Sequence, residues 1–447
     1  MTGTKTILIL DFSSESNIGD IALQEGLIQL LRRHYPGARL TATTIFGANQ
    51  TVDARTHFQT LFDNDDIAVG GALRPSFYPI DGEPANTYAF ELLNLIGVLL
   101  GYCWAGLLRL SPSLASALLP ARYRKTLALL QEADFIVWKG KNFRNTKWLI
   151  EPYRVLSRLY MPIVCHILGK PMACVGVSVW PLNNPLSRAA LRAVLARCEH
   201  VSVRERLSGQ AVDALFNGAA RRPEIAQYPD LSLALLREYT PKPPPADDAP
   251  LGTIALTLVD WTGSGLAARE RYIAALVALV EHAVEKYAAE FVIVPQVTKT
   301  WEAADYIAEQ IVSRVSPTAR EHIRIAEAEH GVEGVLAFYE KADFLIATRM
   351  HSAIFALAVG TPVIAIPYDD GAKWSILDDL GAGPHRIPYH SVTSEALITE
   401  FEAVVSDRSA YMTEVSARVR EQVALVDQCV LGFEQAMPGG GTESDDE

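Results

Sequence analysis

Residues 344–366 read FLIATRMHSAIFALAVGTPVIAI, and this stretch contains one complete strand–helix–strand unit. The apolar runs at 344–347 and 363–366 each have the length and composition of a buried strand. Between them lies a helical pattern at 352–359, which a glycine closes and Pro362 follows, as helix ends prefer. Strands that are apolar throughout and separated by helices predict a parallel sheet covered on both faces.

The same alternation runs through most of the chain. The segment 241–250 interrupts it, because five of its ten residues are proline and exclude a helix interior or a central strand. We therefore predict an α/β protein with two Rossmann-like doubly wound domains, 1–240 and 251–437, joined by this linker and facing a central cleft. Residues 438–447 are predicted to form a disordered acidic tail. The other predicted strands are 6–12, 40–45, 135–138, 173–179, 201–203, 253–258 and 291–294, and the other predicted helices are 21–33, 186–196, 206–216, 267–287 and 303–315.

Charge is distributed unevenly along the 447 residues. The chain has 40 Lys and Arg against 52 Asp and Glu, which argues against a general nucleic-acid binder. Residues 1–250 hold 26 basic and 22 acidic side chains, whereas residues 251–447 hold 14 and 30. The five cysteines are scattered without a CxxC pair, so we expect a reducing cytoplasm and neither a disulfide framework nor zinc.

Polar loops follow several predicted strands. In the first, residues 13–20, Asp20 is either a cap of the next helix or a carboxylate that accepts a proton from a substrate hydroxyl. In the second, Arg349 and His351 lie between a strand end and a helix N-terminus. Backbone N–H groups at such a terminus bind anions, an arginine strengthens the site, and histidine exchanges protons near neutral pH.

Further cations follow other strands. Arg204 comes after 201–203, Lys139, Lys141 and Arg144 come after 135–138, and Lys373 comes after 363–366. Each alone would be solvated surface charge, but together they predict a small, multiply charged anionic ligand. The sequence has no GxxxxGK[ST] and no GxGxxG motif, and no cluster with metal-ligand spacing. We therefore expect no nucleotide cofactor and no metal.

An ordered set of short motifs covers most of the chain. The motifs are Asn17-Ile-Gly-Asp20, residues 176–187, Ser202-Val-Arg-Glu205, Pro229-Asp230, Pro295-Gln296, Arg349-Met-His351, and Tyr368-Asp369 followed by Lys373. Each motif alone is weak, but in their order and spacing they are fairly specific, and together they resemble the polysaccharide pyruvyl transferase family. That family commonly has a glycine-rich loop after the strand at 135–138, where this chain has lysines.

The resemblance implies a fold like that of GT-B glycosyltransferases, phosphoenolpyruvate as donor and a sugar of a polysaccharide or lipid-linked glycan precursor as acceptor. It implies that Arg204, Arg349 and His351 lie among the donor-binding and catalytic residues, and that Asp20 lies in a motif of the acceptor side. We predict His351 and Asp20 as the catalytic residues, with Asp20 as the base. The predicted donor-binding residues are Arg204, Arg349, Lys373 and Ser352, and the predicted acceptor-binding residues are Asn17, Lys139, Lys141 and Arg144.

The residues fit this chemistry. Phosphoenolpyruvate carries a carboxylate and a phosphate, which Arg204, Arg349 and Lys373 would clamp with N–H groups near Ser352. His351 would protonate C3, sugar hydroxyls would attack C2, and phosphate would leave a pyruvate ketal. Two alternatives stay open: a GT-B glycosyltransferase using a nucleotide sugar, and a non-catalytic glycan-binding family member.

The stretch 92–110 is unusually apolar and is long enough to span a membrane. A span inside a doubly wound domain would split the sheet, which leaves a buried helix or a membrane-surface helix. The second alternative gains support from residues 109–158, which hold ten basic and three acidic side chains and suit an anionic membrane face. The sequence thus predicts a cytoplasmic protein, with peripheral attachment to the inner face of the cell membrane under that alternative.

Overall fold

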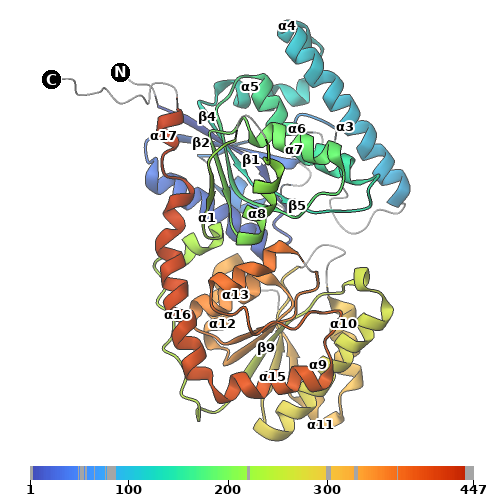
Figure 1. Cartoon of the computed structure of the whole chain (residues 1–447), viewed down its shortest axis with the longest axis vertical. Coiled ribbons are helices and arrows are strands. Elements are labelled where there is room, and N and C mark those ends of the chain that lie inside the picture. The colour runs from blue at the N-terminus through green and yellow to red at the C-terminus, as the bar shows by residue number, and fades with distance from the viewer. Residues whose placement is uncertain are drawn as a thin grey trace, which may run out of the picture. The chain divides into compact units, whose positions relative to one another are not determined.

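The computed structural model describes residues 4–48, 50, 55, 58–64, 66–75, 77, 87–218, 222–297, 304–326, 331–369 and 371–437. These residues form two compact units, each built on its own parallel sheet (Figure 1). Unit 1 holds the chain up to Glu15, Leu23–Ala234 and the described residues from Leu425 on. Unit 2 holds Ser16–Ala22 and Leu235–Ala424. The predicted class, α/β with two parallel-sheet domains, is confirmed.

The sheet of unit 1 has the strand order β3-β2-β1-β4-β6-β7-β8, and every neighbouring pair is parallel. The order reverses between β1 and β4, which makes this pair the switch point of the sheet. The strands are β1 (Thr6–Phe12), β2 (Arg39–Gly47), β3 (Ala68–Ala72), β4 (Phe135–Lys139), β6 (Met172–Val179), β7 (His200–Val203) and β8 (Ile225–Gln227), and a short β5 (Asn142–Phe143) pairs with β6.

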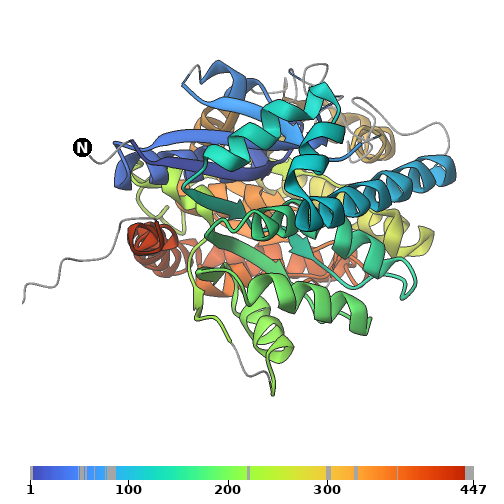
Figure 2. The same cartoon turned by 90° about the horizontal axis from the view of Figure 1, so that it is seen from above.

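Helices accompany this sheet, and the long helix α3 projects beyond the strands on one side (Figure 2). The apolar side chains of the strands are buried, because helices cover the sheet as a doubly wound connection requires. The helices are α1 (Ile18–His34), α2 (Gln59–Asp63), α3 (Thr87–Leu110), α4 (Pro112–Leu118), α5 (Ala121–Glu132), α6 (Glu151–Ile167), α7 (Pro185–Leu195), α8 (Arg206–Leu215) and α17 (Phe433–Ala436), with 3-10 turns η2 (Leu231–Leu236) and η5 (Val426–Cys429).

Unit 2 repeats the design with the order β11-β10-β9-β12-β13, and its switch point lies between β9 and β12. The strands are β9 (Thr253–Thr257), β10 (Glu290–Ile293), β11 (Ile323–Ile325), β12 (Phe344–Ala347) and β13 (Val363–Ala365). The helices are α9 (Leu266–Tyr287), α10 (Asp305–Arg314), α11 (Pro317–Glu321), α12 (Gly331–Lys341), α13 (Met350–Val359), α14 (Ile376–Asp379), α15 (Ser394–Ser406) and α16 (Arg408–Leu425), with 3-10 turns η3 (Thr262–Ser264) and η4 (Ala372–Ser375).

The strand–helix–strand unit of residues 344–366 forms as predicted, with α13 beginning two residues earlier than the predicted 352–359. Gly360 closes α13 with φ of 92°, and the N–H of Thr361 donates to the carbonyl O of Ala356 at 2.8 Å. The sequence missed β3, β8 and β11. Two of these have three residues each, too few for a periodic signal, and β3 contains two glycines, which weaken a strand pattern.

The proline-rich segment 241–250 contains neither helix nor strand and is fastened within unit 2. The buried guanidinium of Arg408 donates to the carbonyl O of Asp247 at 3.0 Å, and the N–H of Lys242 donates to the carbonyl O of Val359 at 3.1 Å. The units therefore divide at Ala234, ahead of this segment. The predicted acidic tail 438–447 lies outside the described residues.

Candidate functional site

Arg349 and His351 lie where β12 ends and α13 begins, as the sequence predicts. Arg349 is the N-cap residue and is buried, and its Nε donates to the carbonyl O of Leu258 at 3.2 Å. Because Leu258 follows β9, this bond holds the guanidinium across the switch point of the unit 2 sheet. Doubly wound sheets bind their ligands outside the carboxyl ends of the strands at this point.

The motif Asn17–Asp20 packs against His351 within unit 2. The N–H of Ile18 donates to the carbonyl O of Gln296 at 3.2 Å, which fastens the motif beyond the end of β10. Gly19 approaches the imidazole so closely that a Cβ atom there would lie 2.0 Å from Nδ1 of His351. The structure thus brings together three of the quoted motifs, although they are far apart in the sequence.

Asn17 caps helix α1. Its Oδ1 accepts a hydrogen bond from the N–H of Gly19 at 3.0 Å, and its carbonyl O accepts from the N–H of Asp20 at 3.0 Å. Asp20 is half-buried in the first turn, where a carboxylate is favoured by the helix dipole. The capping role that the sequence left open for Asp20 therefore belongs to Asn17.

Ser352 is fully buried in the first turn of α13, and its side chain faces Tyr339 of α12. Its hydroxyl is thus directed into unit 2. The backbone N–H groups of residues 350–352 belong to the first turn, where no carbonyl of the same helix is available to them. An anion beside Arg349 would meet these N–H groups rather than the Ser352 hydroxyl.

Lys373 lies in η4, which follows β13. Its Nζ donates to the hydroxyl of Tyr368 at 2.8 Å and forms an ion pair with Asp369 at 3.0 Å. Burial acts to lower the pKa of Lys373, but Tyr368 and Asp369 outweigh it, so the pKa is raised and the ammonium stays charged. Asp370, in the same predicted loop, lies outside the described residues.

Lys139 and Lys141 lie at the switch point of unit 1, beyond the end of β4. Nζ of Lys139 donates to Oε1 of Gln24 at 3.4 Å, and Nζ of Lys141 donates to the carbonyl O of Asp11 at 2.7 Å. Both ammonium groups also reach the hydroxyl of Ser13, at 3.5 and 3.4 Å. The two lysines therefore converge on the carboxyl end of β1.

Asp11 has φ of 64°, a left-handed conformation that is uncommon outside glycine and often marks a functional site. Burial raises the pKa of its carboxyl group, while Lys141, Arg74 and Lys139 act to lower it. One carboxylate and three cationic side chains thus meet near this switch point. Nothing in the sequence around Asp11 indicates this role except its position at the end of a predicted strand.

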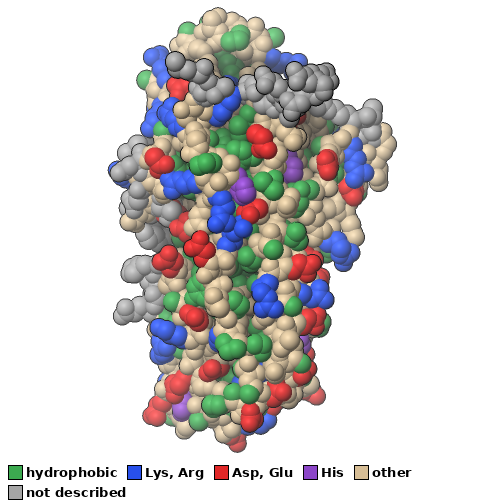
Figure 3. Space-filling view, turned by 90° about the vertical axis from the view of Figure 1, so that its left-hand side faces the viewer, with side chains coloured by type: hydrophobic (Ala, Val, Ile, Leu, Met, Phe, Trp, Pro, Cys, Tyr) green, Lys and Arg blue, Asp and Glu red, His purple; other side chains and the backbone are tan. Residues whose placement is uncertain are grey.

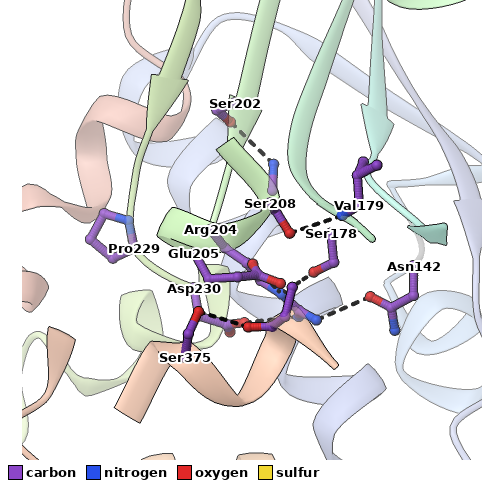
Figure 4. Close-up of polar contacts among 12 residues, drawn as sticks. Asn142, Ser178, Val179, Ser202, Arg204, Glu205, Ser208, Pro229, Asp230 and Ser375 are labelled. Carbon is purple, nitrogen blue, oxygen red and sulfur yellow. Dashed lines mark hydrogen bonds and ion pairs between the residues drawn. The ribbon is translucent and has the colours of Figure 1, made fainter. Parts of the chain in front are cut away.

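Arg204 is buried in unit 1 and is the centre of a polar network (Figure 4). Its Nε donates to the hydroxyl of Ser178 at 2.8 Å, its Nη1 to Asp230 at 3.0 Å and its Nη2 to Asn142 at 3.1 Å. Glu205 lies 3.4 Å from Nε. Two buried carboxylates therefore compensate the charge of Arg204.

Glu205 is fully buried beside Arg204. Burial raises the pKa of its carboxyl group, and the guanidinium offsets only part of this effect. Asp230 is held by the N–H and the hydroxyl of Ser232, at 3.0 and 2.6 Å. The sequence motifs contain Glu205 and Asp230 but do not indicate that these carboxylates neutralise Arg204. The ion pair of Arg204 with Asp230 joins residues that follow different strands.

Arg144 does not share the contacts of Lys139 and Lys141. Its guanidinium carbon lies over the ring of Trp180, 5.9 Å from the ring centroid. A second feature that the sequence missed is an aromatic pair in unit 2. Trp261 follows β9 and Tyr368 follows β13, and their ring centroids are 5.1 Å apart. Because β12 lies between those strands, the pair extends beside the strand end that carries Arg349.

Charge on the outer surface is mixed. On the face drawn in Figure 3, basic and acidic side chains are intermingled and neither forms a continuous area. Within the part of the chain that the structure describes, no group of three or more His, Cys, Asp or Glu side chains could hold a metal ion. The cations that we consider for binding an anionic ligand are therefore the buried ones that follow the strands.

A family model described as polysaccharide pyruvyl transferase matches residues 17–370, which is most of the chain. The matched range begins at Asn17 and contains the loops around Arg204 and Arg349. No curated protein sequence matches the chain significantly.

Solved structures resemble the chain in fold at low sequence identity. A putative UDP-N-acetylglucosamine 2-epimerase from Listeria monocytogenes has a TM-score of 0.57 and 12% identity, over 97% of this chain and 96% of that chain. The UDP-GlcNAc 2-epimerase from Neisseria meningitidis, solved with UDP-GlcNAc bound, has a TM-score of 0.54 and 11% identity, over 95% of this chain and 97% of that chain. A UDP-forming trehalose-phosphate synthase from Burkholderia xenovorans has a TM-score of 0.52 and 11% identity, over 98% of this chain and 100% of that chain. These neighbours are GT-B enzymes, and the likeness establishes that fold.

Proposed function

The chain belongs to the polysaccharide pyruvyl transferase family, and from this premise we propose that it is a transferase that uses phosphoenolpyruvate. The pyruvyl group moves to a sugar of a polysaccharide or of a lipid-linked glycan precursor, a pyruvate ketal forms and phosphate is released. The reaction belongs to polysaccharide biosynthesis, and exopolysaccharide is the product class that we propose. We propose that the protein is located in the cytoplasm.

One observation carries the proposal. Arg349 is fixed at the switch point of unit 2 by its bond to Leu258, and His351 lies against Gly19 of the Asn17–Asp20 motif. This arrangement supplies a cation, first-turn N–H groups, an imidazole and a neighbouring carboxylate on one edge of one sheet. These are the groups that a doubly anionic substrate and proton transfer at carbon require.

In the proposed reaction, the imidazolium of His351 protonates C3 of phosphoenolpyruvate and C2 becomes electrophilic. A sugar hydroxyl adds to C2, and Asp20 accepts its proton. A second hydroxyl then forms the second bond from oxygen to C2, and the bond from C2 to the phosphate oxygen breaks. Of the two hydroxyl protons, one restores the acid and the other leaves with phosphate.

Arg349 and Lys373 are the cations that we propose for the carboxylate and phosphate of the donor, together with the N–H groups at 350–352. Lys139 and Lys141 are proposed on the acceptor side, with Asn17 and Arg144. The donor-binding role of Arg204 stays a prediction. Its hydrogen bonds to three side chains and its ion pairs with Glu205 and Asp230 mean that a donor anion would compete with two buried carboxylates for this guanidinium.

A thermal-shift series tests the donor. We expect phosphoenolpyruvate to raise the melting temperature, because a ligand that binds only the folded protein stabilises it. Stabilisation by a UDP-sugar instead would favour a GT-B glycosyltransferase, the alternative to which the structural neighbours give weight. Stabilisation by neither ligand would favour a non-catalytic glycan-binding member.

Two substitutions test the residues. We expect His351→Ala to lower phosphoenolpyruvate-dependent phosphate release by about 10²- to 10⁴-fold, the range for a general acid. Arg349→Ala should cost about 10²- to 10³-fold, as for the loss of one electrostatic stabiliser. His322→Ala and Arg314→Ala serve as matched controls. Near-normal rates in the first variant would remove His351 from the mechanism.

A further inference from the structure

Helix α3 (Thr87–Leu110) carries its large apolar side chains on its outer face. Leu92, Leu99 and Leu100 are each more than half exposed. Helices on a protein surface ordinarily present polar residues to water and apolar ones to the core, so this arrangement is reversed. The exposed apolar residues of α3 and the following α4 are Leu92, Leu93, Ile96, Leu99, Leu100, Leu110, Leu114 and Leu118, and we call this set the α3 face.

Around Asn94, Gly97 and Gly101 the inner side of α3 is small or polar, whereas Val98 and Leu108 are buried apolar residues of the same helix. Asn94 is buried and its Nδ2 donates to the carbonyl O of Phe90 at 3.1 Å. At Gly97 and Gly101 the helix comes so close to its neighbours that added Cβ atoms would lie 2.6 Å from the carbonyl O of Pro75 and 2.9 Å from the ring of Tyr160. The exposed leucines of this stretch thus face outward because the close contacts at Gly97 and Gly101 leave no room for them.

Along residues 92–131, between Glu91 and Glu132, charge has one sign. Residues 92–131 contain no Asp or Glu, in a chain whose formal net charge is -12. The four basic residues of this segment, Arg109, Arg122, Arg124 and Lys125, are all exposed. Exposed apolar side chains with neighbouring cations are the surface that an anionic lipid interface attracts. A polar protein partner would not need the leucines, and an apolar one would not need the cations.

The inner side of α3 packs on Arg74, a cation that acts on the same carboxyl group as Lys139 and Lys141. An added Cβ at Gly101 would lie 3.1 Å from Cβ of Arg74, so α3 packs directly on this arginine. Nη2 of Arg74 donates to the hydroxyl of Ser157 at 2.9 Å, and its charge acts on Asp11 at the end of β1. One short stretch of structure therefore connects the exposed apolar helix with the cations at the unit 1 switch point.

We propose that the α3 face docks on an anionic bilayer surface, and that the acceptor sugar reaches Lys139 and Lys141 while attached to a lipid through phosphate. The part of this inference that concerns the acceptor rests on the proposed function. The docking of the α3 face on a bilayer does not depend on it. The lipid remains in the bilayer, and its phosphate lies against these cations. This names the substrate class on the acceptor side.

Docking on the surface fits the contacts better than a membrane span. By length and composition, Ala89–Leu110 is the one helix among the described residues that could cross a bilayer, and a third of it is buried. However, α3 packs along α6, since Tyr102 donates to the carbonyl O of Leu156 at 2.9 Å and Glu91 pairs with Arg154 at 3.8 Å. Crossing the bilayer would take the charged side chains of α6 into hydrocarbon.

Vesicle binding tests docking. We expect the full chain to sediment with vesicles of phosphatidylcholine and phosphatidylglycerol, and more weakly with phosphatidylcholine alone. The triple variant Leu92→Gln, Ile96→Gln, Leu99→Gln should lose about tenfold or more in affinity, because apolar area no longer enters the interface. The matched control Leu186→Gln, Leu266→Gln, Ile325→Gln changes residues of similar exposure elsewhere and should bind as the parent chain does.

Cys103 gives a second readout without a substitution. It is the exposed cysteine of α3, whereas the other four cysteines are buried. Anionic vesicles should slow its modification by a water-soluble maleimide. Unchanged labelling together with no sedimentation would overturn docking. Self-association of the parent chain that the triple variant abolishes, again without vesicle binding, would show that a second copy covers the α3 face and would equally overturn it.

A separate experiment tests whether the lysines bind the phosphate of the lipid. Phosphatidylcholine vesicles that contain a small fraction of polyprenyl diphosphate should bind the chain more tightly than plain ones, and Lys141→Ala should remove this gain. A gain that persists in the variant would exclude the cluster as the phosphate site. The thermal shift with phosphoenolpyruvate is independent of vesicles, so failure here and failure of the proposed function are distinguishable.

Discussion

At the scale of residues, the contact between Gly19 and His351 is the most restrictive feature of the candidate site. Neither residue is unusual by itself, and each lies in a loop that the sequence singles out. Their proximity fixes the position of the imidazole, because the backbone of the Asn17–Asp20 motif leaves no room for a side chain. A glycine is required at position 19 for this reason and not for its freedom of φ.

Gly19→Ala tests this requirement. The added methyl would lie 2.0 Å from Nδ1 of His351, so the imidazole or the motif must move. A displacement of about 1 Å can cost on the order of 10²-fold in rate, and we expect a loss of that size in kcat for phosphate release. Gly37→Ala is the control, since a Cβ there meets nothing within 4 Å. Equal rates for the two variants would contradict the assigned position of His351.

The Arg204 network makes a prediction about pH. Because burial raises the folded-state pKa of Glu205 above 4.5, the folded protein binds more protons than the unfolded chain between 4.5 and the raised value. The contribution of this group to stability therefore falls as pH rises through that window. The variant Glu205→Gln lacks this titrating group and so does not lose that stability as the pH rises. Its free energy of unfolding minus that of the parent chain should therefore increase from pH 4.5 to pH 7.

Urea unfolding at several pH values measures this difference, with the exposed Glu199→Gln as control. A difference between Glu205→Gln and the parent chain that does not change with pH would show that the carboxyl group titrates alike in both states. The prediction concerns the slope with pH, since loss of one partner of Arg204 adds a constant cost.

At the scale of elements, the ends of helices and strands explain why the site lies where it does. The start of α13 combines an N-cap arginine, an imidazole and the N–H groups of a first turn, all directly after β12. The start of α1 supplies the second half, because Asn17 caps the helix and Asp20 occupies its first turn. Both sets are fixed by local geometry before any ligand binds.

Substitutions at Asn17 separate its capping role from binding of the acceptor. Asn17→Ala should destabilise unit 2 by about 1 kcal/mol, the usual cost of a lost N-cap. Asn17→Asp keeps the oxygen that accepts from Gly19 and should retain stability. If Asn17→Asp raises the KM for the acceptor while stability is retained, the amide also binds substrate. Loss of stability in Asn17→Asp equal to that in Asn17→Ala would refute the cap.

At the scale of the whole molecule, the proposed donor and acceptor groups belong to different compact units. Arg349, His351 and Lys373 lie in unit 2 with the Asn17–Asp20 motif, whereas Lys139 and Lys141 lie in unit 1. Each group is found at the switch point of its own sheet or on the adjacent edge. The α3 face belongs to unit 1, the unit that carries the proposed acceptor residues.

Hydrogen exchange tests this division. At a concentration 100 times its Kd, phosphoenolpyruvate should stabilise unit 2 by about 2.7 kcal/mol, and amides of unit 2 that exchange only when it unfolds should slow about 100-fold. We also expect new protection at residues 18–20 and 350–352, and unchanged exchange around Lys139 and Lys141. Slowing confined to unit 1 would reverse the proposed donor and acceptor sides.

The sequence by itself determined the two parallel sheets and most of the loops at their carboxyl ends. It could do so because apolar runs, helix periodicity and the Gly360 stop are local signals within a few residues. Arg349 and His351 were found in this way, since a strand end followed by a helix start is written in consecutive letters.

Only the tertiary structure decided which groups meet. It placed Gly19 against His351, paired Arg204 with Asp230, and turned the leucines of α3 outward. The physical reason is that contacts between distant segments depend on how sheets and helices pack, whereas hydropathy reports how apolar a helix is and not which side is covered. The charge of Arg204 looked available in the sequence because its two carboxylate partners are identified only by packing.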